Sequence, residues 1–160
     1  MQTTFTLRQF KPRDLERVIH INRVCLPENY SSYFFMEIYQ RYPAAFIVAA
    51  QEHEIVGYIM CRVETGFSSL GLFSISKKGH IVSIAVLPEY QRKGVGTALI
   101  KEAMKNLCFY KAKGCYLEVR VTNVAAVNMY RKLGFEVVRT AHGYYADNED
   151  AYVMSKKIMG

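Results

Sequence analysis

The sequence predicts an α/β fold in which a mixed seven-stranded sheet is flanked by about four helices. Segments rich in β-branched and aromatic residues recur along the chain and favour strands. Between them lie segments whose apolar residues repeat at the spacing of an amphipathic helix. Because strands and helices interleave, we expect helices on both faces of one sheet, which makes three layers.

Length and composition fit one domain. The chain has 160 residues, of which 51% are hydrophobic, and a chain of this size buries a substantial core. Its sequence contains no internal repeat, no low-complexity tract and no Pro/Gly-rich linker. We therefore expect residues 1–160 to fold as a single domain.

The N-terminal half is predicted to contain two helices and four strands. Alternating apolar and polar residues predict a strand over Phe5–Phe10, and Pro12 opens a helix that ends before Pro27. The segment Gly66–Gly79, with four serines and three glycines, predicts a mobile loop. The other elements are a short helix over Tyr33–Arg41, a hairpin of Phe46–Ala50 and Ile55–Glu64 with a polar turn around His53–Glu54, and a buried strand over His80–Leu87.

The C-terminal half is predicted to contain two helices and three strands. Apolar residues at 95, 99, 103 and 107 share one face of a long helix over residues 94–111. The elements after it are a strand over Tyr116–Val121, a helix over Asn123–Leu133, and strands over Phe135–Thr140 and Tyr152–Lys157.

The net charge limits the classes of partner. A formal charge of +7 attracts acidic groups, but the basic residues are dispersed and form no Lys/Arg run with interleaved aromatic residues. We therefore expect no specific nucleic-acid recognition. The phosphates of a cofactor, or a weak association with the ribosome, explain the sign of the charge equally well.

Cysteine spacing and hydropathy favour the cytoplasm. Cys25, Cys61, Cys108 and Cys115 lie in apolar stretches without a CxxC spacing, which favours reduced core thiols over disulfides or a zinc site. The N-terminus has no apolar signal-peptide core, and the longest apolar run, Ala44–Ala50, is too short to span a bilayer. We expect a soluble cytoplasmic protein that does not partner a membrane.

The most informative segment is the strand-to-helix turn over Gln91–Gly96. Such a turn directs several backbone N–H groups and the positive end of a helix at one point, which favours an anion. Gly94 and Gly96 leave room for a pyrophosphate to approach those N–H groups, and Arg92 and Lys93 add positive charge. The glycines alone would equally well serve a tight turn. A Rossmann or Walker site does not fit, because the third glycine and the G-K-[ST] sequence are both missing.

Two motifs carry a resemblance to a known family. The turn at residues 91–96 is Gln-Arg-Lys-Gly-Val-Gly, which resembles the Gln/Arg-x-x-Gly-x-Gly/Ala signature of the GNAT acetyltransferases. Residues 123–135 resemble that family's N-x-x-A-x-x-x-Y-x-x-x-G-F segment. The resemblance extends over nearly the whole chain. It implies the three-layer GNAT fold, with acetyl-CoA as the co-substrate.

Three further segments resemble a narrower group of enzymes. Residues 26–30, 79–86 and 143–152 look like the catalytic subunits of NatA-type N-terminal acetyltransferases, especially archaeal ones. This resemblance implies transfer of an acetyl group from acetyl-CoA to the α-amino group of protein N-termini that begin with Ser, Ala or Met. The partners that it implies are protein or peptide N-termini and an auxiliary subunit.

The resemblance also assigns residues to the cofactor. In this family the turn binds the pyrophosphate, while the backbone of the preceding strand holds the pantetheine arm as if it were an added strand and polarises the thioester carbonyl. The family's tyrosine near the coenzyme sulfur, a proton donor to the leaving thiolate, corresponds to Tyr130. The implied cofactor-binding residues are Ile84, Ala85, Val86, Arg92, Lys93, Gly94, Val95, Gly96, Thr97, Asn123 and Tyr130.

Three residues are alternatives for the general base. Glu118 matches the base of bacterial ribosomal-protein acetyltransferases, and His80 and Glu28 match groups invoked in archaeal relatives. Each also has a plainer interpretation, with Glu118 an exposed strand carboxylate, His80 a structural histidine and Glu28 a solvated side chain. A metal between His80 and Glu118 would have only two protein ligands, which is too few for a confident site, so we expect none.

The chemistry requires only a modest base. An amine that attacks the thioester directly must be positioned and deprotonated, and the oxyanion must be stabilised. No Ser-His-Asp or Cys-His order is apparent, which agrees with direct transfer. An α-amino group has a pKa of about 7.7–8.0 against about 10.4 for lysine, so about a tenth of it is already neutral near pH 7.

The substrate would be recognised by two loops. Tyr30 and Tyr145, with Tyr144, match loop tyrosines that clamp the N-terminal backbone of the substrate, and Glu28 lies beside Tyr30 in the sequence. A GNAT activity on lysine or on a small amine shares every cofactor residue, and only these loops argue against it. A silent acyl-CoA-binding module is a third alternative, which the combination of Tyr130, Glu118 and His80 disfavours.

Overall fold

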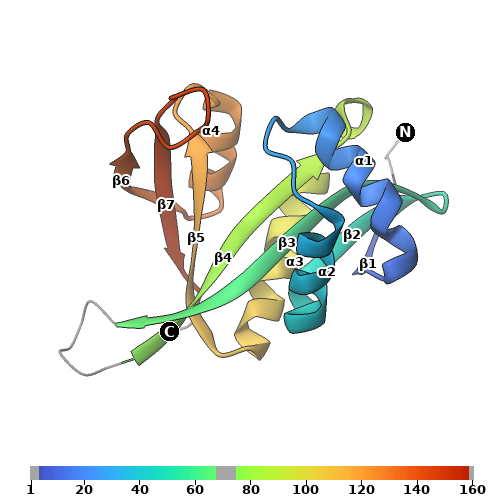
Figure 1. The fold of residues 1–160 in the computed structure, drawn as a ribbon, viewed down its shortest axis with the longest axis horizontal. Coiled ribbons are helices and arrows are strands. Elements are labelled where there is room, and N and C mark those ends of the chain that lie inside the picture. The colour runs from blue at the N-terminus through green and yellow to red at the C-terminus, as the bar shows by residue number, and fades with distance from the viewer. Residues whose placement is uncertain (1–3, 68–74, 159–160) are drawn as a thin grey trace. The chain divides into compact units, whose positions relative to one another are not determined.

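The chain contains seven β-strands and four α-helices in the part that the structure describes. The computed structural model describes residues 4–67 and 75–158. The strands hydrogen-bond in the order β1-β2-β3-β4-β5-β7-β6 (Figure 1). The sheet is mixed, because β4 and β5 run parallel whereas β1/β2, β2/β3, β5/β7 and β6/β7 run antiparallel. The predicted mixed seven-stranded α/β fold is therefore confirmed.

Two compact units divide the chain, and each is described separately. The first comprises residues 1–62 and 81–110, and the second comprises residues 63–80 and 111–160. The strands β3 (Glu54–Phe67) and β4 (Ile75–Val86) contribute residues to both units. Among the described residues, no helix combines the length and the apolar character needed to cross a membrane.

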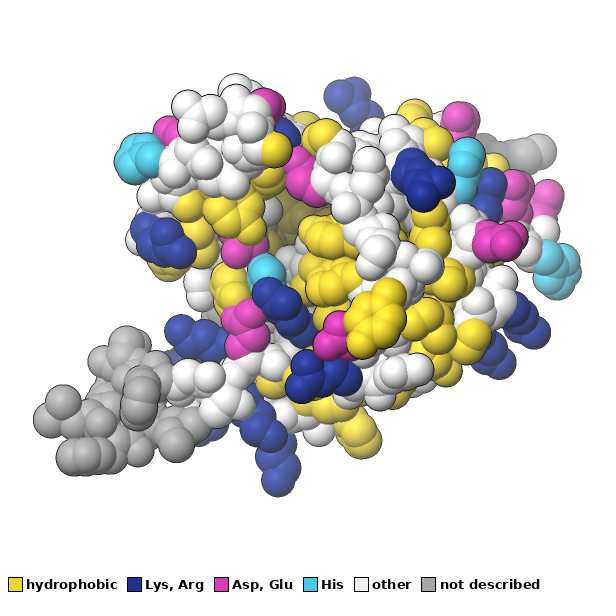
Figure 2. All heavy atoms as spheres, in the orientation of Figure 1, with side chains coloured by type: hydrophobic (Ala, Val, Ile, Leu, Met, Phe, Trp, Pro, Cys, Tyr) yellow, Lys and Arg dark blue, Asp and Glu magenta, His cyan; other side chains and the backbone are white. Residues whose placement is uncertain are grey.

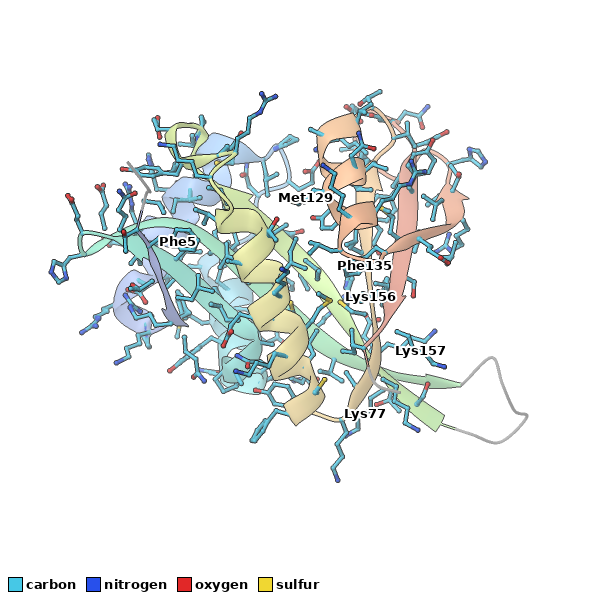
Figure 3. The ribbon with its side chains drawn as sticks, turned by 180° about the vertical axis from the view of Figure 1, so that it is seen from behind. Phe5, Lys77, Met129, Phe135, Lys156 and Lys157 are labelled. Atoms are coloured by element: carbon cyan, nitrogen blue, oxygen red, sulfur yellow. The ribbon has the colours of Figure 1, made fainter. Side chains whose placement is uncertain are left out.

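In the first unit, helices cover both faces of a sheet. α1 and α2 lie on one face of β1, β2 and β3, and α3 lies on the other (Figures 1 and 3). Figure 2 shows hydrophobic side chains gathered on the side where α1 and α2 lie. The elements, besides parts of β3 and β4, are β1 (Thr6–Gln9), η1 (Pro12–Asp14), α1 (Leu15–Cys25), α2 (Ser32–Arg41), η2 (Pro43–Ala45), β2 (Phe46–Gln51), η3 (Pro88–Tyr90) and α3 (Val95–Phe109).

Local sequence explains where these elements begin and end. The hydroxyl of Ser31 accepts a hydrogen bond from the backbone N–H of Phe34 and caps α2. Glu52 and His53 both have positive φ, at 50° and 70°, and form the two-residue turn of the predicted β2/β3 hairpin. The core beneath the helices is rich in aromatic rings, with Phe10 stacked on Phe46 at 4.1 Å between centroids.

The second unit consists of three strands and one helix besides the ends of β3 and β4. α4 is capped by Asn123, whose side chain accepts a hydrogen bond from the backbone N–H of Ala126 at 3.2 Å. Lys156 on the last strand (Figure 3) donates from Nζ to the carbonyl of Leu133 at 2.6 Å. The elements are β5 (Ala112–Arg120), α4 (Val124–Lys132), β6 (Glu136–Ala141) and β7 (Ala151–Lys157).

Three predicted boundaries were wrong. The loop predicted over Gly66–Gly79 is strand at both ends, since β3 continues to Phe67 and β4 starts at Ile75, while residues 68–74 lie outside the described part. Likewise β5 begins at Ala112 and not at 116. The reason is that Lys77 and Lys78 are exposed and break the apolar pattern, yet their backbones pair with β5 from Lys77↔Ala112 onwards. As a result, His80 lies within β4 instead of opening it.

Candidate active site

A cluster of polar side chains lies in the second unit where β4 and β5 pair. His80 and Tyr116 are partners in the parallel register, and Glu118 follows Tyr116 by two residues. Because alternate residues of a strand share a face, all three side chains project to the same side of the sheet. Leu117 and Val119 point to the other side and are buried. Glu118 therefore faces away from both of them.

His80 and Glu118 form a direct pair. Nε2 of His80 lies 2.7 Å from Oε2 of Glu118, and the two side chains are 9% and 16% exposed. The imidazole ring stacks on the ring of Tyr116, with 4.4 Å between centroids and 8° between planes. The sequence had suggested these two residues as alternative bases, whereas in the structure they are hydrogen-bonded to each other.

Glu64 on β3 is a member of this cluster that the sequence did not reveal. Its Oε1 lies 3.9 Å from Nδ1 of His80, and its Oε2 accepts a hydrogen bond from the hydroxyl of Tyr116. In the sequence Glu64 stands at the end of a predicted strand, with nothing to mark it. Only the pairing of strands that are distant along the chain brings Glu64, His80 and Tyr116 together.

The loop after β6 is held by a network of charged groups. The guanidinium of Arg120 donates to both oxygens of Asp147, at 3.0 and 2.8 Å, and to Oε2 of Glu149 at 2.7 Å. The same guanidinium lies over the ring of Tyr145, 4.0 Å from its centroid, and that ring packs edge-on against Tyr144 at 5.0 Å. Arg120 thus packs against Tyr145, which in turn packs against Tyr144. The sequence did not suggest this role for Arg120.

Hydrogen bonds lower the pKa of the three carboxyls of this loop. The pKa of Glu149 lies below its usual value, mainly because Thr122 and then Arg120 donate hydrogen bonds to it. The pKa of Asp147 is lowered by the backbone N–H of Glu149 and by Arg120, and that of Asp150 by the N–H of Gly143 and by His142. All three carboxyls hold the loop in their charged form.

These shifts predict how the loop responds to acid. A carboxyl whose pKa is lowered by folding stabilises the loop above its ordinary pKa of about 4, and this stabilisation is lost as the pH falls through the lowered value. We expect the NMR signals of the Tyr145 ring to stay constant from neutral pH to about pH 4 and to move only below that. In Arg120→Gln the transition should occur at a higher pH; an identical titration in both proteins would contradict the assignment.

In the first unit, a buried amide holds the loop that carries Glu28 and Tyr30. Asn22 on α1 is fully buried, and its Nδ2 donates to the carbonyl of Glu28 and to the hydroxyl of Tyr58, both at 3.1 Å. Its Oδ1 accepts from the N–H of Tyr30 at 3.4 Å. The Tyr58 hydroxyl in turn lies 2.7 Å from Oγ of Ser83, and burial raises the pKa of Tyr58 to about 12. A polar residue on the buried face of α1 was the only sequence signal for this network.

Tyr30 itself lies against the strand predicted to hold the cofactor. Its hydroxyl donates to the backbone carbonyl of Val82 on β4 at 3.3 Å, and its ring stacks on Phe34 with 5.0 Å between centroids. Further along β4, the carbonyl of Val86 accepts from Nε2 of Gln91 at 2.8 Å. The register between β4 and β5 runs from Lys77 to His80, and β4 continues beyond it to Val86.

The predicted phosphate turn leads directly into α3. Arg92 and Gly94 both have positive φ, at 61° and 85°, and residues 91–94 are exposed. Gly94 is the N-cap residue of α3. Because glycine has no side chain, it cannot accept a side-chain hydrogen bond from the first N–H groups of the helix. A Cβ built on Gly94 meets no described atom within 4 Å, so the turn offers open space beside the charged side chains of Arg92 and Lys93.

The two remaining cofactor candidates lie on and before α4. Tyr130 is 5% exposed and packs edge-on against Phe135, with 5.7 Å between centroids. Asn123 is exposed and uses its side-chain oxygen to cap α4. A structural role for Asn123 therefore accompanies the predicted contact with the cofactor.

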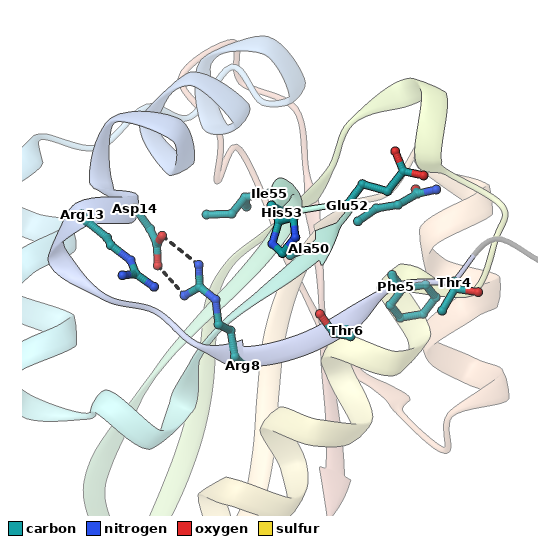
Figure 4. Close-up of a pocket in the computed structure, with 11 residues that line it drawn as sticks. Thr4, Phe5, Thr6, Arg8, Arg13, Asp14, Ala50, Glu52, His53 and Ile55 are labelled. Carbon is teal, nitrogen blue, oxygen red and sulfur yellow. Dashed lines mark hydrogen bonds and ion pairs between the residues drawn. The ribbon is translucent and has the colours of Figure 1, made fainter.

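A pocket of about 880 Å³ in the first unit lies at a different place (Figure 4). It is lined by residues from β1 and the segment before it, from η1 and from the β2/β3 hairpin, including Phe5, Arg13 and His53, and none of the described residues that line it was predicted for the site. Arg8 and Asp14 at its edge form a bidentate ion pair at 2.7 and 3.0 Å. Although burial raises the pKa of Asp14, hydrogen bonds from Arg8 and the N–H of Lys11 outweigh it and leave that pKa lowered.

Comparison with known proteins identifies the family. The model of the acetyltransferase (GNAT) family matches residues 15–135. The chain belongs to the GNAT acetyltransferase family. Among the described residues, no group of three or more His, Cys, Asp or Glu side chains is arranged to hold a metal ion.

Relatives within the GNAT family narrow the comparison. An N-alpha-acetyltransferase of Sulfurisphaera tokodaii is 52% identical over 153 residues, which cover 94% of this chain and 92% of the relative. The crystal structure of Chaetomium thermophilum Naa20 in complex with a bisubstrate analogue has a TM-score of 0.83 at 32% identity and covers 95% and 86% of the two chains. Arabidopsis thaliana Naa50 in complex with the bisubstrate analogue CoA-Ac-MVNAL has a TM-score of 0.80 at 26% identity and covers 96% and 98%.

Proposed function

We propose that this GNAT chain transfers the acetyl group of acetyl-CoA to the α-amino group of protein N-termini. The observation that carries the proposal is the Glu118–His80 pair, a hydrogen-bonded carboxylate and imidazole on a sheet of this fold. Relatives that share half of the sequence are named N-alpha-acetyltransferases, and a structural relative was crystallised with a conjugate of CoA and a peptide. Both facts support the same substrate class.

The co-substrate would be held in the first unit by the end of β4 and the start of α3. The open, positively charged turn at Gly94 fits a pyrophosphate, and the N–H groups of Val95, Gly96 and Thr97 lie in the first turn of α3, where they have no partner within the helix. The backbone of Ile84, Ala85 and Val86 would hold the pantetheine arm. Arg92 and Lys93 would add charge, and Asn123 is a further residue proposed for the cofactor.

Replacing Gly94 by alanine should raise the KM for acetyl-CoA about tenfold, with a smaller effect on the KM for peptide. At a φ of 85° an L-residue costs about 1–2 kcal/mol, so the turn shifts and its donors leave the pyrophosphate. Steady-state kinetics with each substrate varied in turn measures the effect. Gly66→Ala on β3, where an added Cβ also meets open space, is the matched control. Equal KM values for acetyl-CoA in the two variants would contradict the phosphate assignment.

The base would be the Glu118–His80 pair. Glu118 accepts the proton of the attacking amine, and the N–H of His80 at Nε2 stabilises the carboxylate until the proton arrives. The amine nitrogen then attacks the thioester carbonyl, and the resulting oxyanion is stabilised by a backbone N–H of β4. Tyr130 would donate a proton to the leaving thiolate. Glu28 would serve as a substrate-binding residue beside Tyr30 and as a second carboxylate for deprotonation.

Tyr30 would bind the N-terminal backbone of the substrate, and Tyr144 and Tyr145 are proposed for the same role. The hydrogen bond of Tyr30 to Val82 and the stacking of Tyr145 on Arg120 leave these rings pre-organised in their loops. Polar ring tips can bond the first two peptide units of a chain terminus, which a lysine on a flexible stem does not offer. A first residue of Ser, Ala or Met fits this mode of recognition.

Peptides with free and blocked α-amines test the proposal. We expect acetylation of peptides that begin with Ser, Ala or Met and carry one internal lysine, and negligible transfer when the α-amine of the same peptide is blocked. Mass spectrometry of the products locates the acetyl group. Tyr30→Ala and Tyr145→Ala should raise the KM for peptide about tenfold or more and leave acetyl-CoA binding intact, since one substrate hydrogen bond contributes about 1.5 kcal/mol. Efficient modification of the blocked peptide would instead establish a lysine acetyltransferase.

The proposal also covers the domain organisation, the cellular compartment and the partners. We infer that residues 1–160 act as one domain in the cytoplasm, with acetyl-CoA as co-substrate and no metal. The net charge of +7 agrees with transient association with the ribosome or with an auxiliary subunit near nascent chains.

A further inference from the structure

The surroundings of Nδ1, the second ring nitrogen of His80, are not explained by the Glu118–His80 pair alone. Nδ1 of His80 is buried and has no hydrogen-bond partner among the described residues, while Nε2 is engaged by Glu118. A buried ring nitrogen that carries a proton needs an acceptor. Oε1 of Glu64 lies 3.9 Å from Nδ1, which is within ion-pair range but longer than a hydrogen bond.

Tyr116 connects Glu64 to the imidazole. Its ring lies flat on the His80 ring, which restricts rotation of the imidazole about χ2, and its hydroxyl donates to Oε2 of Glu64. One side chain thus holds both members of the Glu64–His80 contact. Glu64 is 39% exposed, so its carboxylate has room for the small rotation that would close the gap to Nδ1.

The charges around His80 favour one protonation state. The titratable groups that face it are Glu64 from β3 and Tyr116 and Glu118 from β5. A neutral imidazole has one N–H and one lone pair, so with a carboxylate at each nitrogen its lone pair would face a negative charge. An imidazolium has an N–H at each nitrogen, so Nε2 donates to Glu118 while Nδ1 faces Glu64 at ion-pair distance, and this conflict is removed.

The geometry points to Glu64 as a positioning residue that, together with Tyr116, holds His80 as a doubly protonated cation beside Glu118. Glu64 does not touch the substrate; it acts through the imidazole. A proton on both ring nitrogens ensures the N–H at Nε2, which holds the carboxylate of Glu118 in place for the proton of the substrate. This inference rests on the proposed acetyl transfer for its kinetic consequence but not for its structural one.

The Glu64→Gln variant tests the assignment. Glutamine keeps the size of the side chain and an acceptor for the Tyr116 hydroxyl but removes the charge. We expect kcat to fall about tenfold, less than the 10²–10⁴-fold typical for removal of a base itself, with both KM values unchanged. Glu136→Gln, an exposed glutamate on β6 of the same unit, is the matched control and should keep the full kcat.

Nitrogen-15 NMR of the histidine rings provides the readout that a merely structural role would not change. In the wild-type protein near pH 7, both nitrogens of His80 should give the signal of a protonated ring nitrogen, and in Glu64→Gln one of them should become unprotonated. Tyr116→Phe keeps the stacking ring but loses the hydroxyl, so it should change kcat and the ring signals in the same direction by a smaller amount. It provides a second test should Glu64→Gln fail to fold.

Two outcomes would overturn the inference. One is a folded Glu64→Gln protein with the wild-type kcat, and the other is a His80 ring whose signals are the same in both proteins. Failure of the proposed function would look different: the wild-type protein would not acetylate a free α-amine at all, while the NMR difference between wild type and Glu64→Gln would persist.

Discussion

Replacing Glu118 by glutamine is expected to lower kcat by about 10²–10⁴-fold while both KM values change little. The amide keeps the size of the side chain and a hydrogen-bond acceptor for the N–H of His80, which lies 2.7 Å away in the native protein. It cannot take up a proton, so the amine must lose its own to water. Steady-state kinetics on a peptide with a free N-terminus measures the loss.

The pH dependence of this defect gives a sharper test. The α-amine has a pKa of about 7.7–8.0, so the neutral fraction of the substrate rises as the pH approaches and passes 8, and the need for a base declines. The ratio of wild-type to Glu118→Gln kcat/KM should therefore shrink between pH 6.5 and 8.5. A variant that matches the wild type at pH 6.5 would move the base to Glu28, the other carboxylate considered from the sequence.

The Tyr130→Phe variant should lower kcat by about 100-fold, the low end of the range for a general acid, with little change in the KM for peptide. The lost hydroxyl acts on charge that develops on the leaving thiolate, and not on the bound ground state. The ring is 5% exposed and packs against Phe135, so phenylalanine preserves this packing and the fold. Single-turnover measurements at saturating substrates isolate the chemical step from product release.

A matched control separates this effect from a general sensitivity to tyrosine loss. Tyr152 on β7 is another partly buried tyrosine of the second unit, and Tyr152→Phe should keep the single-turnover rate of the wild type. Equal rates for Tyr130→Phe and the wild-type protein would restrict Tyr130 to a packing role in the core.

Local pattern predicted most elements of the fold but not their full lengths. The β2/β3 hairpin and α3 were predicted because hydrophobic periodicity and turn residues act over a few positions. β4 and β5 extend further than predicted because backbone pairing is indifferent to the exposed lysines at 77, 78 and 113. Tertiary pairing, and not side-chain character, determines where these strands begin.

The candidate site, like the fold, could be predicted only in part. His80 and Glu118 could be named from motifs, but their contact depends on the parallel register of His80 with Tyr116, which no short segment specifies. Glu64 and Asn22 could not be named, because a lone glutamate in a strand and a lone asparagine in an amphipathic helix have many ordinary explanations. The partner of Glu64, His80, lies 16 positions away in the chain, and the partner of Asn22, Tyr58, lies 36 positions away.

The network around Asn22 links distant positions in the evolution of this chain. The amide of Asn22 bonds three partners at once, and removing it would leave buried polar groups unpaired at about 1–3 kcal/mol each. Replacing Asn22 by leucine should cost less when the hydroxyls of Tyr58 and Ser83, which contact each other, are also removed. We therefore expect positions 22, 58 and 83 to change together or not at all, and the α1–α2 loop, whose backbone bonds to Asn22 at Glu28 and Tyr30, shares this constraint.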